Sequence, residues 1–413
     1  MLAASLFNHL VRDGTLTIVD PAGKAKTMGS GEPHVTVRLH DRVTEARLIA
    51  NPKLALGEAY MDGRLTVDGG ELYTFLDVCA RNAARVENHP FWGLFERMGH
   101  ALRPLRTFNP SHRARRNVAH HYDLSDTLYD AFLDSDRQYS CAYWTSPEDS
   151  LEDAQHKKKR HLAAKLLLDE PGLSVLDIGS GWGGLGLYLA RSAGARVTGL
   201  TLSEEQIRVS RERARETGLS DRAEFRMRDY RAVEGRFDRI VSVGMFEHVG
   251  TRHYPRFFRT VRDQLRDDGV AVIHSIGRMA PPGGTNPWLR KYIFPGGYIP
   301  ALSEVLSVVE RTGLWVTDVE ILRLHYAETL RAWRQRFLAA RERMAELYDE
   351  RFCRMWAFYL AACEVSFRHM GQMVFQLQLA RRQDAVPLTR DYITDWERAR
   401  AAMETDHTAA AAE

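Results

Sequence analysis

The feature that most constrains the fold is an alternation of short apolar runs with helical stretches between residues 174 and 276. The apolar runs are SVLDIG (174–179), RVTGLTL (196–202), AEFRMRD (223–229), FDRIVSVG (237–244) and VAVIHSI (270–276). Helical patterns at 184–193, 203–217 and 253–267 separate them. Strand–helix alternation of this kind predicts an α/β fold with a doubly wound parallel sheet and helices on both faces.

The sequence on either side of this core predicts two additions. Residues 34–40 (HVTVRLH) alternate apolar and polar, and 51–60 and 71–84 read as helices, so we expect a small N-terminal α+β domain. The stretches 301–312 and 326–380 predict helical C-terminal additions. The domain boundaries that we predict are 1–105, 106–398 and a flexible tail at 399–413.

Two segments lie outside this periodic pattern. Residues 277–300 are dense in Gly and Pro, which is typical of a lid or binding loop. Residues 94–120 form a basic bridge that is either a solvated linker or a surface for anionic groups. Its arginines are Arg97, Arg103, Arg106, Arg113, Arg115 and Arg116.

Composition excludes several classes of protein. There are 57 Lys and Arg against 54 Asp and Glu, and a formal charge of +3 gives no argument for nucleic acid. The four cysteines form no CxxC or Cys/His spacing, so we expect no metal site and a reducing cytosol. No window reaches about 18 consecutive apolar residues and the N-terminus lacks a basic n-region, so we expect neither a membrane span nor a signal peptide.

A glycine-rich turn, Asp177-Ile-Gly-Ser-Gly-Trp-Gly-Gly184, joins the first strand to a helix. Glycines there let a ligand approach the backbone at a helix N-terminus. The acid precedes the glycines, unlike in a dinucleotide fingerprint, and no Gly-Lys-Ser/Thr follows, unlike in a P-loop. With Asp229 at the end of the third strand, the pattern resembles the S-adenosylmethionine-dependent methyltransferases, which have a Rossmann-like sheet.

This resemblance implies a cofactor site. Asp177 would hold the amino group of S-adenosylmethionine, and Asp229 with Tyr230 would meet the adenine. The second strand ends in Leu-Thr-Leu-Ser without the acid that usually binds the ribose, so we expect Gln206 to make the ribose contact instead. The expected cofactor residues are Tyr122, Tyr139, Ser140, Asp177, Gly179, Gly181, Thr201, Leu202, Gln206, Asp229 and Tyr230.

Further motifs narrow the resemblance to one family. They are Asn117-Val-Ala-His-His-Tyr-Asp123, Tyr139-Ser-Cys-Ala-Tyr-Trp144, Gly244-Met-Phe-Glu-His-Val-Gly250, Ile273-His-Ser-Ile276 and Ile293-Phe-Pro-Gly-Gly-Tyr-Ile-Pro300. In this order they resemble the cyclopropane fatty-acyl-phospholipid synthases over about residues 110–380. Residues 1–105 resemble the lipid-associated domain of the full-length bacterial enzymes.

The family resemblance implies transfer of a methylene unit from S-adenosylmethionine to the cis double bond of a phospholipid acyl chain, closing a cyclopropane ring. An alkene is a weak nucleophile, so it needs an activated methyl group, and the resulting cation needs electron-rich walls and a base. Aromatic faces can stabilise a cation, and the candidates are Tyr139, Tyr143, Phe246 and Tyr298. The family's base is a bound bicarbonate, held here by Cys141, Glu247, His274, the backbone of Ile276, and Tyr326.

Each of these residues also has a structural interpretation. Glu247 could face a helix dipole, and His274 and Cys141 could be ordinary buried side chains. Cys363 matches a family cysteine once regarded as a nucleophile, but thiol attack would destroy the methyl donor, so we favour a structural role. Two other functions stay open: methylation that leaves a branched, unsaturated chain without a ring, and lipid binding with a vestigial cofactor site.

The family resemblance also implies partners. We expect phospholipid acyl chains at the membrane surface, no nucleic acid, and a homodimer. The implied location is cytoplasmic, at the inner face of the membrane.

Overall fold

The computed structural model describes residues 11–83 and 125–410, the last six by their backbone alone. Its described residues form two compact units. Unit 1 contains residues 11–83, 283–297 and 326–372, and unit 2 contains 125–282, 298–325 and 373–410. The predicted boundary between residues 105 and 106 lies outside the described residues.

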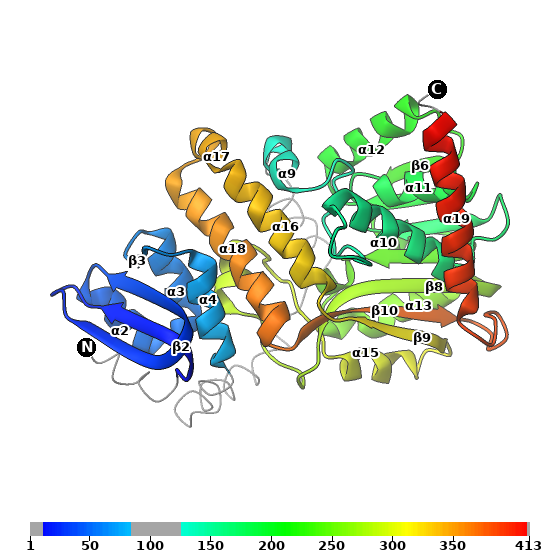
Figure 1. Ribbon diagram of the computed structural model, residues 1–413. Coiled ribbons are helices and arrows are strands. Elements are labelled where there is room, and N and C mark those ends of the chain that lie inside the picture. The colour runs from blue at the N-terminus through cyan, green and yellow to red at the C-terminus, as the bar shows by residue number, and fades with distance from the viewer. Residues whose placement is uncertain (1–10, 84–124, 411–413) are drawn as a thin grey trace. The chain divides into compact units, whose positions relative to one another are not determined.

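Unit 2 holds a seven-stranded sheet with the order β6-β5-β4-β7-β8-β10-β9 (Figure 1). The strands are β4 (Ser174–Ile178), β5 (Arg196–Thr201), β6 (Ala223–Met227), β7 (Phe237–Val243), β8 (Leu265–Arg278), β9 (Trp315–Leu322) and β10 (Gln372–Ala380). Strands β4 to β8 pair in parallel, and β9 pairs antiparallel with β10. The five predicted strands are confirmed, and so is the doubly wound α/β class.

Helices cover both faces of this sheet. The helices of unit 2 are α9 (Asp126–Phe132), α10 (Leu151–Lys165), α11 (Gly184–Ser192), α12 (Glu204–Glu216), α13 (Tyr254–Gln264), α15 (Leu302–Val309) and α19 (Asp391–Ala410), with short 3₁₀ turns η1 (Tyr230–Ala232), η2 (Phe246–His248) and η3 (Thr251–His253). Leu176 packs with α13 and α15 on one face, whereas its neighbour Val175 packs with α10 and α11 on the other. Side chains that alternate between two covered faces explain why these strands read as continuous apolar runs.

Unit 1 combines a three-stranded antiparallel sheet with helices. Its elements are β1 (Asp13–Val19), β2 (Ala25–Leu39), α2 (Arg42–Ala50), α3 (Pro52–Met61), β3 (Leu65–Asp68), α4 (Leu72–Arg81), α14 (Pro287–Tyr292), α16 (His325–Ala339, from Tyr326 on), α17 (Arg341–Leu347) and α18 (Glu350–His369). Residues 283–297 and 326–372 therefore group with the N-terminal strands, which differs from the domain division that the sequence predicts. Trp288 shows one reason, since its ring fills the space that Gly57 leaves open and its Nε1 lies 3.2 Å from Met61 Sδ.

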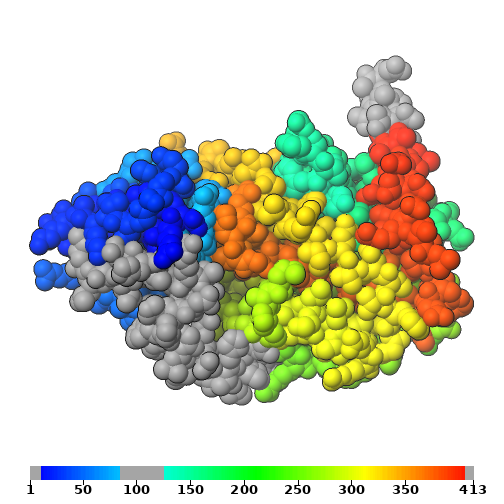
Figure 2. Space-filling model, turned by 60° about the horizontal axis from the view of Figure 1, so that its bottom comes forward, coloured from blue at the N-terminus to red at the C-terminus, as the bar shows by residue number. Residues whose placement is uncertain are grey.

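Two sequence-based expectations about the C-terminal part are corrected. The predicted helix 326–380 stops at His369, because Gly371 has φ +67° and the chain then enters strand β10. The predicted tail from residue 399 continues as α19, which packs beside α10 and lies at the molecular surface (Figure 2). The Glu404 carboxylate accepts hydrogen bonds from Tyr188 at 2.8 Å and His156 at 3.0 Å, which fixes this end of the helix.

Candidate active site

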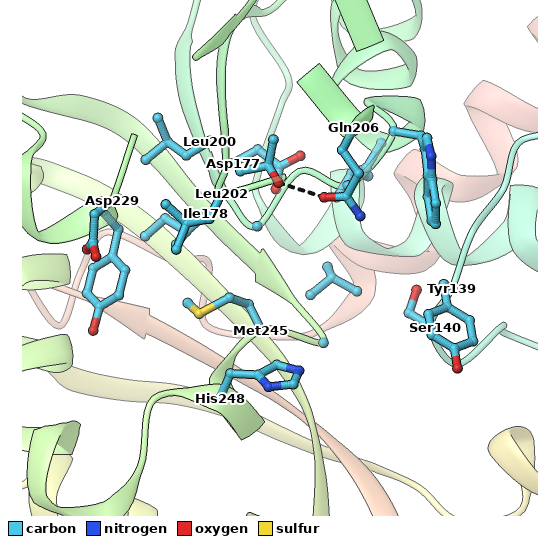
Figure 3. Close-up of a pocket in the computed structure, with 18 of the residues that line it drawn as sticks. Tyr139, Ser140, Asp177, Ile178, Leu200, Leu202, Gln206, Asp229, Met245 and His248 are labelled. Carbon is cyan, nitrogen blue, oxygen red and sulfur yellow. Dashed lines mark hydrogen bonds between the residues drawn. The ribbon is translucent and has the colours of Figure 1, made fainter. Parts of the chain in front are cut away.

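A pocket lies at the carboxyl ends of β4, β5 and β7, where parallel α/β sheets usually bind ligands (Figure 3). Ten of the eleven predicted cofactor residues line it, and the eleventh, Tyr122, lies outside the described residues. The ten are Tyr139, Ser140, Asp177, Gly179, Gly181, Thr201, Leu202, Gln206, Asp229 and Tyr230. The structure thus brings together residues that are up to 91 positions apart in the sequence.

Two glycines shape the turn after β4. Gly179 has φ +90°, and a Cβ there would lie 2.8 Å from Met245 Cβ, so only glycine lets the two loops meet. Gly181 has φ +54°, and nothing lies within 4 Å of where its Cβ would be. The turn therefore leaves open space beside the backbone at the pocket wall.

Asp177 is the buried acid of the pocket, with a relative exposure of 1%. Burial raises the pKa of its carboxyl group to about 7, and the Lys158 ammonium opposes this rise. Its Oδ2 atom is buried and has no hydrogen-bond partner among the described residues. An unsatisfied buried acceptor on a pocket wall is suited to a donor brought by a ligand, such as an ammonium group.

The second strand supplies Thr201 and Gln206. Ser203 caps α12 by accepting a hydrogen bond from the Gln206 backbone amide at 3.3 Å, which sets Gln206 in the first turn of the helix. The Thr201 hydroxyl donates to Gln206 Oε1 at 2.6 Å (Figure 3), so the amide nitrogen of Gln206 remains as a donor for a ligand.

Asp229 and Tyr230 close another side of the pocket. Arg231 donates from Nε to Asp229 Oδ1 at 2.8 Å, and its backbone amide donates to the same oxygen at 2.9 Å. Burial opposes ionisation of Asp229, but these bonds lower the pKa of its carboxyl group, so it is charged at neutral pH. The Tyr230 ring packs edge-on against Phe257, 5.4 Å between centroids.

Three of the predicted base-site residues lie at the next strand ends. The Ile276 backbone amide donates to Glu247 Oε1 at 2.7 Å, so these two residues are in contact. Burial raises the pKa of the Glu247 carboxyl group to about 7, and its Oε2 is buried without a partner among the described residues. His274 lies within 3.2 Å of Gln376 Nε2 through its Nδ1, and burial lowers its pKa well below the usual value, so its ring is neutral.

The remaining base-site residues occupy other places. Cys141 is buried in the loop before α10, and its thiol donates to the Ala142 carbonyl at 3.3 Å. Tyr326 and Cys363 belong to unit 1, in α16 and α18. Desolvation raises the pKa of the Cys363 thiol to about 12, so it is not a thiolate at neutral pH.

Of the four aromatic candidates for stabilising a cation, only Tyr139 lines the pocket. Tyr143 stacks on His161, with 4.2 Å between ring centroids. Phe246 is fully buried against Tyr254, and the Tyr298 hydroxyl donates to Glu304.

Sequence reasoning missed several pocket residues. Met245 and His248 face the pocket from the turn after β7 (Figure 3). Both belong to the quoted motif GMFEHVG at a strand end, so their position could have indicated them. The described residues contain no group of three His, Cys, Asp or Glu placed to bind a metal, and in the same residues no helix is long and apolar enough to span a membrane.

Comparisons with known proteins identify the family of the chain. Residues 109–377 match the family described as mycolic acid cyclopropane synthetase, and residues 4–89 match a domain of unknown function, DUF7884. The chain is 36% identical to a cyclopropane-fatty-acyl-phospholipid synthase of Escherichia coli K12, covering 85% of this chain and 89% of that protein. It is 37% identical to the tuberculostearic acid methyltransferase UfaA1 of Mycobacterium tuberculosis, covering 92% of each.

A solved structure is similar as well. It is the mycolic acid cyclopropane synthase CmaA1 complexed with SAH and CTAB, with a TM-score of 0.62 and 30% identity. The match covers 66% of this chain and 99% of that one. The chain therefore belongs to the mycolic acid cyclopropane synthetase family and is an S-adenosylmethionine-dependent methyltransferase.

Proposed function

We propose that the protein transfers a methylene unit from S-adenosylmethionine to the cis double bond of unsaturated acyl chains in membrane phospholipids, forming a cyclopropane ring. The observation that carries this proposal is that two carboxylate oxygens, Asp177 Oδ2 at the pocket and Glu247 Oε2 beyond β7, are both buried without a hydrogen-bond partner among the described residues. The first suits the cofactor's ammonium group and the second suits a bound base.

The pocket residues fit S-adenosylmethionine. Asp177 would bind its amino group, Gln206 a ribose hydroxyl, and Asp229 with Tyr230 the adenine. The open space beside Gly181 leaves room for the chain of the amino acid. When bound, the sulfonium supplies an activated methyl group, which an alkene can attack.

Glu247, His274 and Ile276 are suited to hold bicarbonate, with Cys141 as a further member, and the role of Tyr326 remains a prediction from the family resemblance. Glu247 Oε2 can accept a proton from the bicarbonate hydroxyl, and His274 that accepts at Nδ1 carries its proton at Nε2, where it can donate. The Ile276 amide already donates to Glu247 Oε1, so it either orients that carboxylate or donates to both Glu247 and bicarbonate. A positioned general base contributes about 10²–10⁴ in rate.

Purified protein, S-adenosylmethionine and vesicles of monounsaturated phospholipid test the proposal. We expect acyl chains that gain one CH₂ by mass and show upfield cyclopropane protons by NMR. If the phospholipid acyl chains gain no mass while S-adenosylmethionine still binds, the proposal that phospholipid is the acceptor is refuted. Failure to bind S-adenosylmethionine would refute the cofactor site and leave lipid binding.

The alternative product is a methyl-branched unsaturated chain, formed when the cation loses a neighbouring proton instead. One observation favours keeping it: the methyltransferase UfaA1 is as similar to this chain as the cyclopropane synthase is. The same NMR spectrum separates the two, because the branched product retains olefinic protons.

We further propose a homodimer that acts at the inner face of the membrane, with residues 1–105 as the lipid-associated domain. The phospholipid named for the Escherichia coli relative supports a membrane substrate. Light scattering of the eluted protein gives the oligomeric mass, and co-sedimentation with vesicles tests membrane binding.

A further inference from the structure

Two side chains of α10, one turn apart, hold the pocket segment 138–140. Gln155 Nε2 donates to the backbone carbonyl of Ser140 at 2.9 Å and to that of Gln138 at 3.2 Å. Lys158 Nζ donates to Gln138 Oε1 at 2.6 Å and to Ser140 Oγ at 2.8 Å. Because Gln138, Tyr139 and Ser140 all line the pocket, α10 positions one of its walls.

Lys158 is unusual among the lysines of this helix. It is fully buried, and in the part of the chain that the structure describes it makes no ion pair, whereas Lys157 pairs with Asp149 and Lys159 with Asp136. Its two partners are neutral oxygens, and burial lowers the pKa of its ammonium group to about 8. Burying an ammonium without an ion pair destabilises a fold, so its placement calls for another explanation.

The explanation lies in the charges around it. The titratable groups that interact with Lys158 are Asp134, Asp136, Lys159, Cys141, Asp177 and His274. Its ammonium is the cation that opposes the rise of the Asp177 pKa, and it helps to keep His274 neutral. One lysine therefore acts electrostatically on the pocket acid and on a residue of the proposed base site.

We propose that Lys158 is a positioning residue of the cofactor site: with Gln155 it fixes the wall 138–140, and its positive charge favours the charged form of the Asp177 carboxyl group, which receives the cofactor's ammonium group. This inference rests on the proposed cofactor site. It assigns two separable roles, one to hydrogen bonds that both residues make and one to a charge that only Lys158 carries.

Calorimetric titration with S-adenosylhomocysteine between pH 6 and 7.5 separates the roles. Lys158→Met removes both the hydrogen bonds and the positive charge of Lys158. Lys158→Gln removes the charge but keeps a hydrogen-bond donor. Gln155→Leu removes the hydrogen bonds to the backbone of residues 138 and 140 but keeps the charge of Lys158. Lys157→Met is the matched control on the same helix. Circular dichroism checks that each variant is folded.

We expect Lys158→Met to bind S-adenosylhomocysteine about tenfold or more weakly at pH 7. Wild-type affinity falls as pH drops and Asp177 takes up a proton. Without the Lys158 charge the carboxyl group is protonated more easily, so in Lys158→Met and Lys158→Gln this fall begins at higher pH. Gln155→Leu should bind more weakly with an unshifted pH profile, and Lys157→Met should match the wild type.

Several results would overturn the inference. If the Lys158→Met variant is folded and binds S-adenosylhomocysteine with the affinity and pH profile of the wild type, both proposed roles of Lys158 are refuted. Should that variant not fold, an unshifted profile in Lys158→Gln refutes the charge role, and unchanged affinity in Gln155→Leu refutes the positioning role. Wild-type protein that does not bind S-adenosylhomocysteine refutes the cofactor site itself.

Discussion

The Ile276 backbone amide donates a hydrogen bond to Glu247 Oε1 at 2.7 Å, which ties strand β8 to the turn after β7. This bond satisfies one carboxylate oxygen and leaves the other, Oε2, buried without a partner among the described residues. Burial raises the pKa of the Glu247 carboxyl group to about 7, so near neutral pH it can both accept and return a proton.

Glu247→Gln tests this carboxyl group. The glutamine oxygen still accepts from Ile276, so the loop keeps its geometry, but the side chain cannot exchange a proton. We expect product formation to fall by about 10²-fold or more, with S-adenosylhomocysteine affinity within about twofold of wild type. The control is Glu310→Gln, an exposed acid of unit 2. Loss of cofactor binding in Glu247→Gln would contradict this assignment.

The core of the fold could be predicted because its strands are buried on both faces and separated by helices. Strands β9 and β10 are not among the predicted strands, although the structure shows a regular alternation of side chains along β10. Met373, Phe375, Leu377 and Leu379 point to one buried face, but Val374, Gln376 and Gln378 are buried on the other. The run Phe375-Gln-Leu-Gln-Leu379 does alternate apolar and polar residues, but it begins shortly after helix α18 ends at His369, so the helical prediction extends through it. Strand β9 is mostly exposed or half-buried and has no comparable apolar run.

The site shows the same division. Asp177 and Asp229 stand at strand ends, where sequence position alone implies a shared edge of the sheet. Lys158 lies in a run of three lysines, 157–159, and only tertiary packing distinguishes it from its neighbours by burying it completely. Tyr326 was assigned by family resemblance, and its role stays a prediction.

Asp177→Asn should raise the free energy of unfolding and weaken cofactor binding. In the folded protein the carboxyl pKa is about 7, against 3.8 when solvated. Above pH 7 the group is charged in both states, and the folded state bears the cost of burying that charge. The gap of about 3 pH units corresponds to about 4 kcal/mol.

We therefore expect Asp177→Asn without cofactor to be more stable than wild type above pH 7, by up to that amount. The difference should shrink as pH falls from 7 towards 3.8, because the folded wild type takes up its proton first. Urea unfolding at several pH values measures this. S-adenosylhomocysteine should stabilise only the wild type; a variant less stable than wild type at pH 8 would contradict the account.

Glu58→Gln should loosen the segment 283–297. The buried Glu58 carboxylate accepts hydrogen bonds from Lys291 Nζ at 2.6 Å and from the Tyr292 hydroxyl at 2.9 Å, and it also pairs with Arg47. Losing the charge should cost about 1–3 kcal/mol of unfolding free energy and speed tryptic cleavage after Arg290 and Lys291. Asp68→Asn, which breaks a half-exposed pair with Arg38, is the control. Equal cleavage rates in both variants would show that Glu58 does not hold this segment.

Glu404→Gln should show that the Glu404 carboxylate holds α19 against the rest of unit 2. Burial opposes ionisation of Glu404, but hydrogen bonds from His156 and Tyr188 and the charge of Arg160 lower its pKa to about 2. A lowered carboxyl pKa stabilises the fold above the solvated value of 4.5, and this contribution disappears as pH falls towards 2. The variant should therefore be less stable than wild type at pH 7, by about 1 kcal/mol or more, and nearly equal to it at pH 2. Urea unfolding at both pH values measures the difference, with the exposed Asp395→Asn on the same helix as control. A difference that is the same at pH 2 and pH 7 would mean that the carboxylate charge does not hold the helix in place.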